Sequence, residues 1–146
     1  MHQFDLKNKT AVITGGAQGF GLDIAKKFLL SGSKVFIWDI DEKELSKSTK
    51  EINNSNLNYS VVDVSNFDQV QKTVSEITSK NNIDILVNNA GITGPTAELW
   101  NYNIKDWNSV VDINLHGTFY CCKSIVPHMI KNNYGRIVNI ASVAGK

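Results

Sequence analysis

Residues 10–21 read Thr-Ala-Val-Ile-Thr-Gly-Gly-Ala-Gln-Gly-Phe-Gly, and this stretch decides the fold. The β-branched run 11–14 predicts a strand, the glycines predict a turn directly after it, and the chain from Gly19 onward has helical spacing. Glycine is needed where the backbone turns with positive φ, or where a side chain would hold a ligand away. The helix would point N–H groups and the positive end of its dipole at the turn. The stretch therefore predicts an anion site that suits a pyrophosphate.

A second feature supports this interpretation, because a glycine turn between a strand and a helix is weak evidence alone. The apolar run 34–39 predicts the next strand and ends in Asp39, at the separation expected for a carboxylate that hydrogen-bonds the adenosine ribose. An anion there would repel a 2′-phosphate, and neither Gln18 nor Ile40 supplies a cation to bind one. The sequence therefore favours NAD over NADP. The alternative role of Asp39, as the N-cap of the following helix, is compatible with ribose binding.

The same alternation of strand and helix continues along the chain. The run 35–38, Val-Phe-Ile-Trp, is continuously apolar, which is typical of strands covered on both faces in a parallel sheet. We therefore expect one α/β domain over residues 1–146, a doubly wound parallel sheet of the Rossmann type, with ligands outside the carboxyl ends of the strands. The expected strands are 11–14, 34–39, 58–64, 84–88 and 136–140, and the expected helices are 19–30, 41–51, 66–80 and 104–131.

Side-chain patterns on the expected helices give further predictions. Ser65 and Asp68 predict a capping box at the start of the helix 66–80. Asn114 falls on the apolar stripe of the helix 104–131, and a buried amide without a partner costs about 1–3 kcal/mol, so we expect it to be hydrogen-bonded or functional. His116 lies off that stripe and is expected at the surface or at a subunit contact, whereas Tyr120 is expected to pack. The stripe consists of Trp107, Val110, Val111, Leu115, Thr118, Cys122 and Ile125.

Composition excludes several classes of function. The formal net charge is +1, so nothing attracts nucleic acid or an anionic membrane surface. The N-terminus has no signal-peptide core, and no apolar run is long enough to span a bilayer. The two cysteines, Cys121 and Cys122, are neighbours, which excludes a disulfide framework and fits a cytoplasmic location. The three histidines are scattered, so no metal site is expected.

Five motifs, in order, resemble those of the short-chain dehydrogenase/reductase family. They are the glycines spaced G-x-x-x-G-x-G after Thr14, Asp63-Val64, Asn88-Asn89-Ala90-Gly91, Asn114 within Asp-Ile-Asn-Leu, and the segment 135–142, Gly-Arg-Ile-Val-Asn-Ile-Ala-Ser. The resemblance covers essentially the whole chain. It implies an oxidoreductase that transfers a hydride between NAD(H) and a small alcohol or ketone. It also implies that the full-length form is a homo-oligomer.

The resemblance also implies roles for individual residues. Asn114 would distort its helix and order a water in a proton relay. Ser142 would hydrogen-bond the substrate oxygen and stabilise its developing charge. By spacing alone, 89–91 and Ser142 would be ordinary turn residues. The implied cofactor-binding residues are the loop Gly15, Ala17, Gln18, Gly19, Phe20 and Gly21, with Phe20 on the cofactor, then Asp39 at the ribose, Asp63 and Val64 at the adenine, and Asn89, Ala90 and Gly91 at the inner ribose.

One departure from the family pattern concerns the chemistry itself. A tyrosine followed by a lysine four residues later should come about a dozen residues after the serine, because the lysine lowers the phenol pKa. None of Tyr102, Tyr120 and Tyr134 has such a lysine. We therefore expect a domain truncated after its fifth strand, whose bare edge invites aggregation. Expressed alone, it is expected to aggregate or to bind NAD weakly, and to show no turnover.

Two alternatives remain open at this point. The first is a non-catalytic nucleotide-binding module that ends at Lys146. The second is an NADP-dependent 3-oxoacyl carrier-protein reductase. The stretch 90–95, with Leu99-Trp100 and Tyr134-Gly135-Arg136, is similar to family members that act on 3-oxoacyl carrier-protein or on sugar acids. The substrate is therefore expected to belong to one of these two classes.

Overall fold

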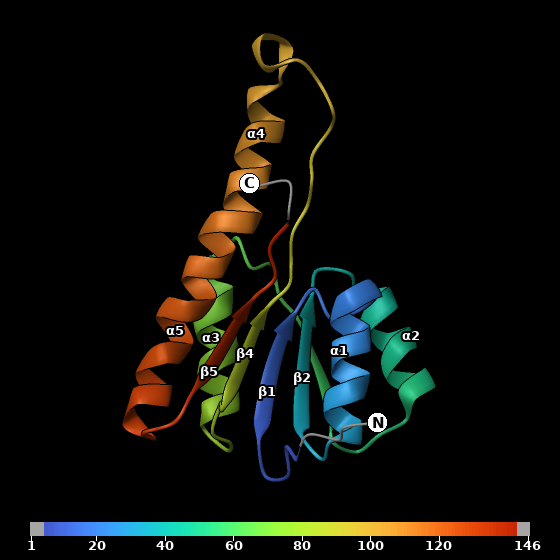
Figure 1. Cartoon of the computed structure of the whole chain (residues 1–146), viewed down its shortest axis with the longest axis vertical. Coiled ribbons are helices and arrows are strands. Elements are labelled where there is room, and N and C mark those ends of the chain that lie inside the picture. The colour runs from blue at the N-terminus through green and yellow to red at the C-terminus, as the bar shows by residue number, and fades with distance from the viewer. Residues whose placement is uncertain (1–4, 143–146) are drawn as a thin grey trace.

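A parallel sheet lies at the centre of the molecule. The structure, a computed structural model, describes residues 5–142. Within this range five strands pair in the order β3–β2–β1–β4–β5, all parallel (Figure 1). The chain order β1-α1-β2-α2-β3-α3-β4 is that of a doubly wound, Rossmann-type α/β fold, as the sequence predicted. The strands are β1 (Thr10–Thr14), β2 (Lys34–Asp39), β3 (Leu57–Val61), β4 (Ile85–Asn88) and β5 (Arg136–Asn139).

Helices cover both faces of the sheet. Neighbouring residues of β1 point to opposite faces, so Ala11 and Ile13 pack with α1 and α2, while Val12 packs with α3 and α5. This explains why the central strands are apolar throughout. The helices are α1 (Gly19–Leu30), α2 (Glu42–Ile52), α3 (Phe67–Thr78), α4 (Ile104–Val111) and α5 (Gly117–Lys131), with a short 3₁₀ helix at Leu99–Asn101.

The predicted helix 104–131 is one continuous rod in three parts, α4, a π turn at Asp112–His116 and α5 (Figure 1). The α5 part packs into the core through Cys121, Ile125 and Met129, and Ile113 of the π turn packs against the same core. The α4 part projects beyond the carboxyl ends of the strands, so the prediction of one buried stripe is wrong. Trp107 and Leu115, for example, are 55% and 63% exposed.

Two further predictions need correction. The helix α3 is capped by Asn66, whose side chain accepts a hydrogen bond from the Gln69 backbone N–H, and not by Ser65. Likewise Asp41, not Asp39, caps α2 by accepting from the Glu44 N–H. In both cases the residue directly before the first helical turn has the extended backbone that an N-cap requires.

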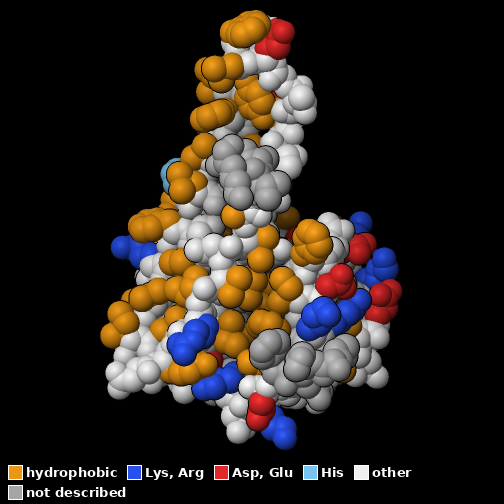
Figure 2. All heavy atoms as spheres, in the orientation of Figure 1, with side chains coloured by type: hydrophobic (Ala, Val, Ile, Leu, Met, Phe, Trp, Pro, Cys, Tyr) orange, Lys and Arg blue, Asp and Glu red, His pale blue; other side chains and the backbone are white. Residues whose placement is uncertain are grey.

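The strand β5 is exposed along its whole length. Ile137 and Val138 are 41% and 45% exposed, and apolar side chains gather on the face seen in Figure 2. The expected bare apolar edge is therefore present in the described chain. Within residues 5–142, no helix combines the length and apolar character needed to cross a membrane.

Candidate functional site

A cavity of about 320 Å³ lies at the carboxyl ends of the strands. It is formed by the loops that follow β1, β2, β3 and β4, together with the π turn. Parallel strands bring these loops to one edge of the sheet, which is where ligands bind in this architecture. The lining residues are Gly15, Gln18, Asp39, Ile40, Val62, Asp63, Val64, Asn89, Ala90, Gly91, Ile92 and Ile113.

The glycine loop after β1 requires glycine at two positions for different reasons. Gly15 has φ +62°, and a Cβ there would lie 2.9 Å from the Cα of Ala90. Gly19 has φ +55°, and a Cβ there would meet no atom within 4 Å. Gly15 thus lets the loop pack against the turn after β4, while Gly19 starts α1 beside open space.

Thr14 and Asn89 fasten the glycine loop to the turn after β4. The Thr14 hydroxyl accepts hydrogen bonds from the backbone N–H groups of Asn89 and Ala90, each at 3.0 Å. The Asn89 amide donates to the carbonyl oxygens of Thr14 and Gly15, also at 3.0 Å. Small residues therefore lie at this strand end, and the Asn89 side chain joins the ends of β1 and β4.

The carboxylate of Asp39 faces the same loop. Its Oδ2 accepts a hydrogen bond from the Ala17 N–H at 3.2 Å, and its Oδ1 accepts from the Asp41 N–H at 3.2 Å. Asp39 and Asp63 are the charged groups among the lining residues, and no lysine or arginine of the described chain lines the cavity. The cavity thus carries negative charge at its β2 and β3 ends.

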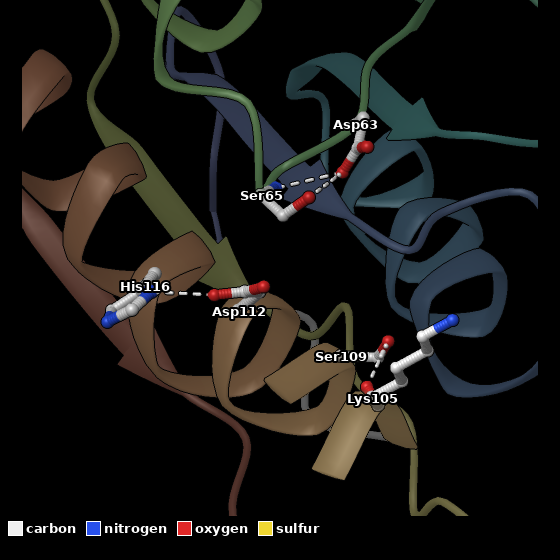
Figure 3. Close-up of polar contacts among 6 residues, drawn as sticks. All are labelled: Asp63, Ser65, Lys105, Ser109, Asp112 and His116. Atoms are coloured by element: carbon white, nitrogen blue, oxygen red, sulfur yellow. Dashed lines mark hydrogen bonds and ion pairs between the residues drawn. The ribbon is translucent and has the colours of Figure 1, made fainter. Parts of the chain in front are cut away.

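The turn after β3 forms another wall, and it is held by its own side chains. The Asp63 Oδ1 accepts hydrogen bonds from the Ser65 N–H at 2.9 Å and from the Ser65 hydroxyl at 2.6 Å, and the two side chains point toward one another (Figure 3). The Asp63 N–H donates to the Gln69 Oε1 at 3.0 Å. Val62 and Val64 are buried yet lie outside β3, which ends at Val61 and not at 64.

The π turn closes the cavity on the side of β4. The Asn114 amide makes two hydrogen bonds with the backbone of Ile92, donating to its carbonyl at 2.8 Å and accepting from its N–H at 2.9 Å. Asn114 is exposed, so the prediction that it packs among apolar side chains is wrong; the expectations that it is hydrogen-bonded and that its helix is distorted are confirmed. His116 pairs with Asp112 at 2.9 Å on the exposed surface of this turn (Figure 3).

Most of the predicted site residues meet at this cavity. Gly15, Gln18, Asp39, Asp63, Val64, Asn89, Ala90 and Gly91 line it directly. Ala17 is bonded to Asp39, and Gly21 packs against Gly15. Gly19 and Phe20 are exposed beside the loop, and Ser142 is exposed three residues beyond the end of β5. Four further lining residues were not predicted as site residues, and all four are apolar residues close to predicted ones: Ile40, Val62, Ile92 and Ile113.

Nicotinamide-dependent enzymes share this arrangement of loops, and comparison with known proteins decides the family. The family model for short chain dehydrogenases matches residues 9–146. The chain belongs to the short-chain dehydrogenase family. This is a family of oxidoreductases that act on CH–OH groups with nicotinamide cofactors. In the described part of the short-chain dehydrogenase chain, no group of three His, Cys, Asp or Glu residues is placed to hold a metal.

The proteins similar to this chain include one named with NAD(+) and one whose crystal structure contains NADP. A 2-dehydro-3-deoxy-L-rhamnonate dehydrogenase (NAD(+)) from Sphingomonas sp. (strain SKA58) is 39% identical over 94% of this chain and 55% of its own length. The 3-oxoacyl-[acyl-carrier-protein] reductase FabG of Chlamydia pneumoniae is 39% identical over 97% of this chain and 58% of its own. A gluconate 5-dehydrogenase from Burkholderia cenocepacia J2315, crystallised with NADP and tartrate, has a TM-score of 0.90 at 32% identity.

The chain is shorter than these relatives. The gluconate 5-dehydrogenase structure covers 99% of this chain, whereas the chain covers 57% of that structure. The shared portion includes every loop of the cavity. A tyrosine followed by a lysine four residues later does not occur in the 146 residues. The 146 residues thus contain the loops that form the cavity and no such Tyr-x-x-x-Lys pair.

Proposed function

We propose that this chain is the NAD(H)-binding half of an oxidoreductase that transfers a hydride between NAD(H) and a small alcohol or ketone. The observation that carries the proposal is the Asp39 carboxylate, which lines the cavity and is hydrogen-bonded to the glycine loop at Ala17. A carboxylate in this place accepts hydrogen bonds from both ribose hydroxyls of NAD, and it repels the 2′-phosphate of NADP.

The residues around the cavity fit a dinucleotide. The open space at Gly19 and the positive end of the α1 dipole suit the pyrophosphate, with Gly15, Gln18, Phe20 and Gly21 completing the loop. Asp63 and Val64 would hold the adenine at the β3 end. Asn89, Ala90 and Gly91 would lie at the inner ribose, towards β4 and β5. When bound, the nicotinamide ring supplies or accepts the hydride.

Two residues are proposed to act on the substrate side. Ser142 follows the end of β5, and its hydroxyl would donate a hydrogen bond to the substrate oxygen. Asn114, whose π turn reaches Ile92, would order a water for proton transfer. Without a Tyr-x-x-x-Lys pair, residues 1–146 by themselves are expected to show no turnover, and measurable turnover would contradict this part of the proposal.

The substrate class proposed is a hydroxy acid or sugar acid. The similarity to the rhamnonate and gluconate dehydrogenases supports it. The carboxylate of Asp39 supports it as well, because a preference for NAD suits an enzyme that oxidises its substrate. The similarity to the 3-oxoacyl carrier-protein reductases supports the alternative, an NADP-dependent reductase. Cofactor choice separates the two.

The experiment is a calorimetric titration of the full polypeptide as its gene encodes it, with NAD⁺ and NADP⁺ in turn. We expect NAD⁺ to bind at least about tenfold more tightly, the effect of roughly 1.4 kcal/mol at the ribose. Tighter binding of NADP⁺ would favour the reductase alternative. Absence of binding for both cofactors would overturn the proposal. A panel of sugar acids and 3-oxoacyl thioesters then tests the substrate class, with each reaction monitored by the absorbance of NADH.

A further inference from the structure

Gly117, the first residue of α5, lies directly against Val64 in the wall of the cavity. A Cβ at Gly117 would lie 2.8 Å from the Val64 Cγ2, 3.1 Å from its Cβ and 3.4 Å from its carbonyl oxygen. Gly117 is buried, and Val64 is 7% exposed. The hydrogen of glycine therefore occupies a space that no larger side chain fits without displacing Val64.

The backbone at Gly117 does not itself require glycine. Its φ of −58° and ψ of −46° are those of an ordinary helix, which every L-residue adopts. Glycine is also among the least favourable residues inside a helix. The glycine thus lowers the stability of the helix, and the close approach to Val64 is the structural reason for its presence.

Val64 has little freedom to move away. Valine is β-branched and has restricted rotamers. The turn that contains Val64 is fixed by the hydrogen bonds of Asp63 to Ser65 and Gln69. On the other side, α5 is anchored in the core by Cys121, Ile125 and Met129. A methyl group at position 117 would therefore move Val64 relative to the π turn, and both Val64 and Ile113 line the cavity.

We propose that Gly117 is a positioning residue that sets the shape of the cavity at its β3 end and thereby the affinity for the adenosine half of the cofactor. The inference rests on the proposed function, because that function assigns the adenine to Asp63 and Val64. Gly117 acts through Val64 and is not itself among the residues that line the cavity.

The test uses ADP-ribose, which carries the adenosine half without nicotinamide, and five versions of the full polypeptide. These are the wild type, Gly117→Ala, Val64→Ala and the double variant, with Lys123→Ala, an exposed change on the same helix, as the control. Circular dichroism establishes the temperature at which each version is folded, and the dissociation constant is measured below it. We expect Gly117→Ala to weaken ADP-ribose binding about tenfold. The double variant should bind within about threefold of Val64→Ala, since alanine at 64 removes both γ-methyl groups.

The outcomes are distinct. A folded Gly117→Ala protein with unchanged affinity would overturn the inference, as would a double variant that binds more than about threefold more weakly than Val64→Ala. Should Gly117→Ala fail to fold, the double variant decides: restored folding with binding like Val64→Ala supports the inference, and failure of either overturns it. Absence of ADP-ribose binding by a folded wild type would instead count against the proposed function.

Discussion

The Asp39 carboxylate and the Ala17 backbone N–H are joined by a hydrogen bond of 3.2 Å between Oδ2 and N. This contact links the end of β2 to the glycine loop after β1. The other carboxylate oxygen accepts from the Asp41 N–H at the start of α2. The side chain is therefore oriented by two backbone groups before any ligand binds, which is what a ribose-binding acid requires.

The first prediction separates the charge of Asp39 from its hydrogen bonds. Asp39→Asn keeps an oxygen acceptor for one backbone N–H but removes the negative charge. We expect the ratio of NAD⁺ to NADP⁺ affinity to fall by about tenfold, mainly because repulsion of the 2′-phosphate is lost. Glu42→Gln, an exposed carboxylate on α2, is the control. An unchanged ratio in Asp39→Asn would show that this charge does not select the cofactor.

The second prediction compares two glycines with positive φ. Gly15→Ala and Gly19→Ala both incur the strain of a left-handed backbone, about 1 kcal/mol. Only at Gly15 does the new methyl also meet packed backbone, 2.9 Å from the Ala90 Cα. Urea unfolding without cofactor should therefore show a further loss of about 1–3 kcal/mol for Gly15→Ala. Equal losses in the two variants would mean that the loop moves away from the turn at no cost.

The third prediction concerns the amide of Asn114. Asn114→Ala removes both hydrogen bonds to the Ile92 backbone, which are exposed, so the expected loss is about 1 kcal/mol. Amide hydrogen exchange at Ile92 should accelerate about fivefold, with little change in the core strands. Asn108→Ala, an exposed change on α4, should leave this rate unaltered. Uniform acceleration through the sheet would indicate global destabilisation instead.

The fourth prediction follows from Cys121. Burial, and secondarily the neighbouring Cys122, raises the pKa of the Cys121 thiol from 9.0 to about 12. The thiol form is thus favoured in the folded state, so its contribution to stability is complete below pH 9 and is lost as the pH rises towards 12. Between pH 9 and 11, the wild type should lose on the order of 1 kcal/mol more per pH unit than Cys121→Ala.

Alkylation gives an independent check on Cys121. Iodoacetamide reacts with thiolates, so the folded protein at pH 8 should remain unmodified at Cys121, and unfolding in urea should expose it. Peptide mass spectrometry resolves modification at 121 from that at 122. Rapid labelling of Cys121 in folded protein would contradict the burial on which the pH prediction depends.

The strands and the glycine loop could be predicted because local pattern and topology agree there. The run 34–39 coincides with β2 to the residue, since its apolar side chains are buried on both faces. The run 58–64 was predicted too long at its end. Val62 and Val64 are buried in the wall of the cavity and do not belong to the strand. A buried loop and a buried strand both contain apolar residues, so the sequence alone could not tell them apart.

The packing of the long helix could not be predicted from its periodicity. Periodicity locates an apolar stripe but says nothing about how far the sheet extends beneath it. Trp107 belongs to α4, which projects beyond the strand ends, and it is exposed for that reason; Leu115, in the π turn, is exposed as well. The role of Gly117 was equally hidden, because its close neighbour, Val64, lies 53 positions earlier in the chain.

The π turn at Asp112–His116 places a surplus residue in an otherwise regular helix. The turn therefore sets the rotation of one helical segment relative to the next. Asn114 contacts Ile92, whereas Cys121, Ile125 and Met129 of α5 pack in the buried core. Each residue advances a helix by about 100°. Removing one residue here would rotate Asn114 and α4 by that angle relative to α5, which is anchored in the core. The number of residues in this turn is therefore constrained more strictly than the identity of its exposed side chains.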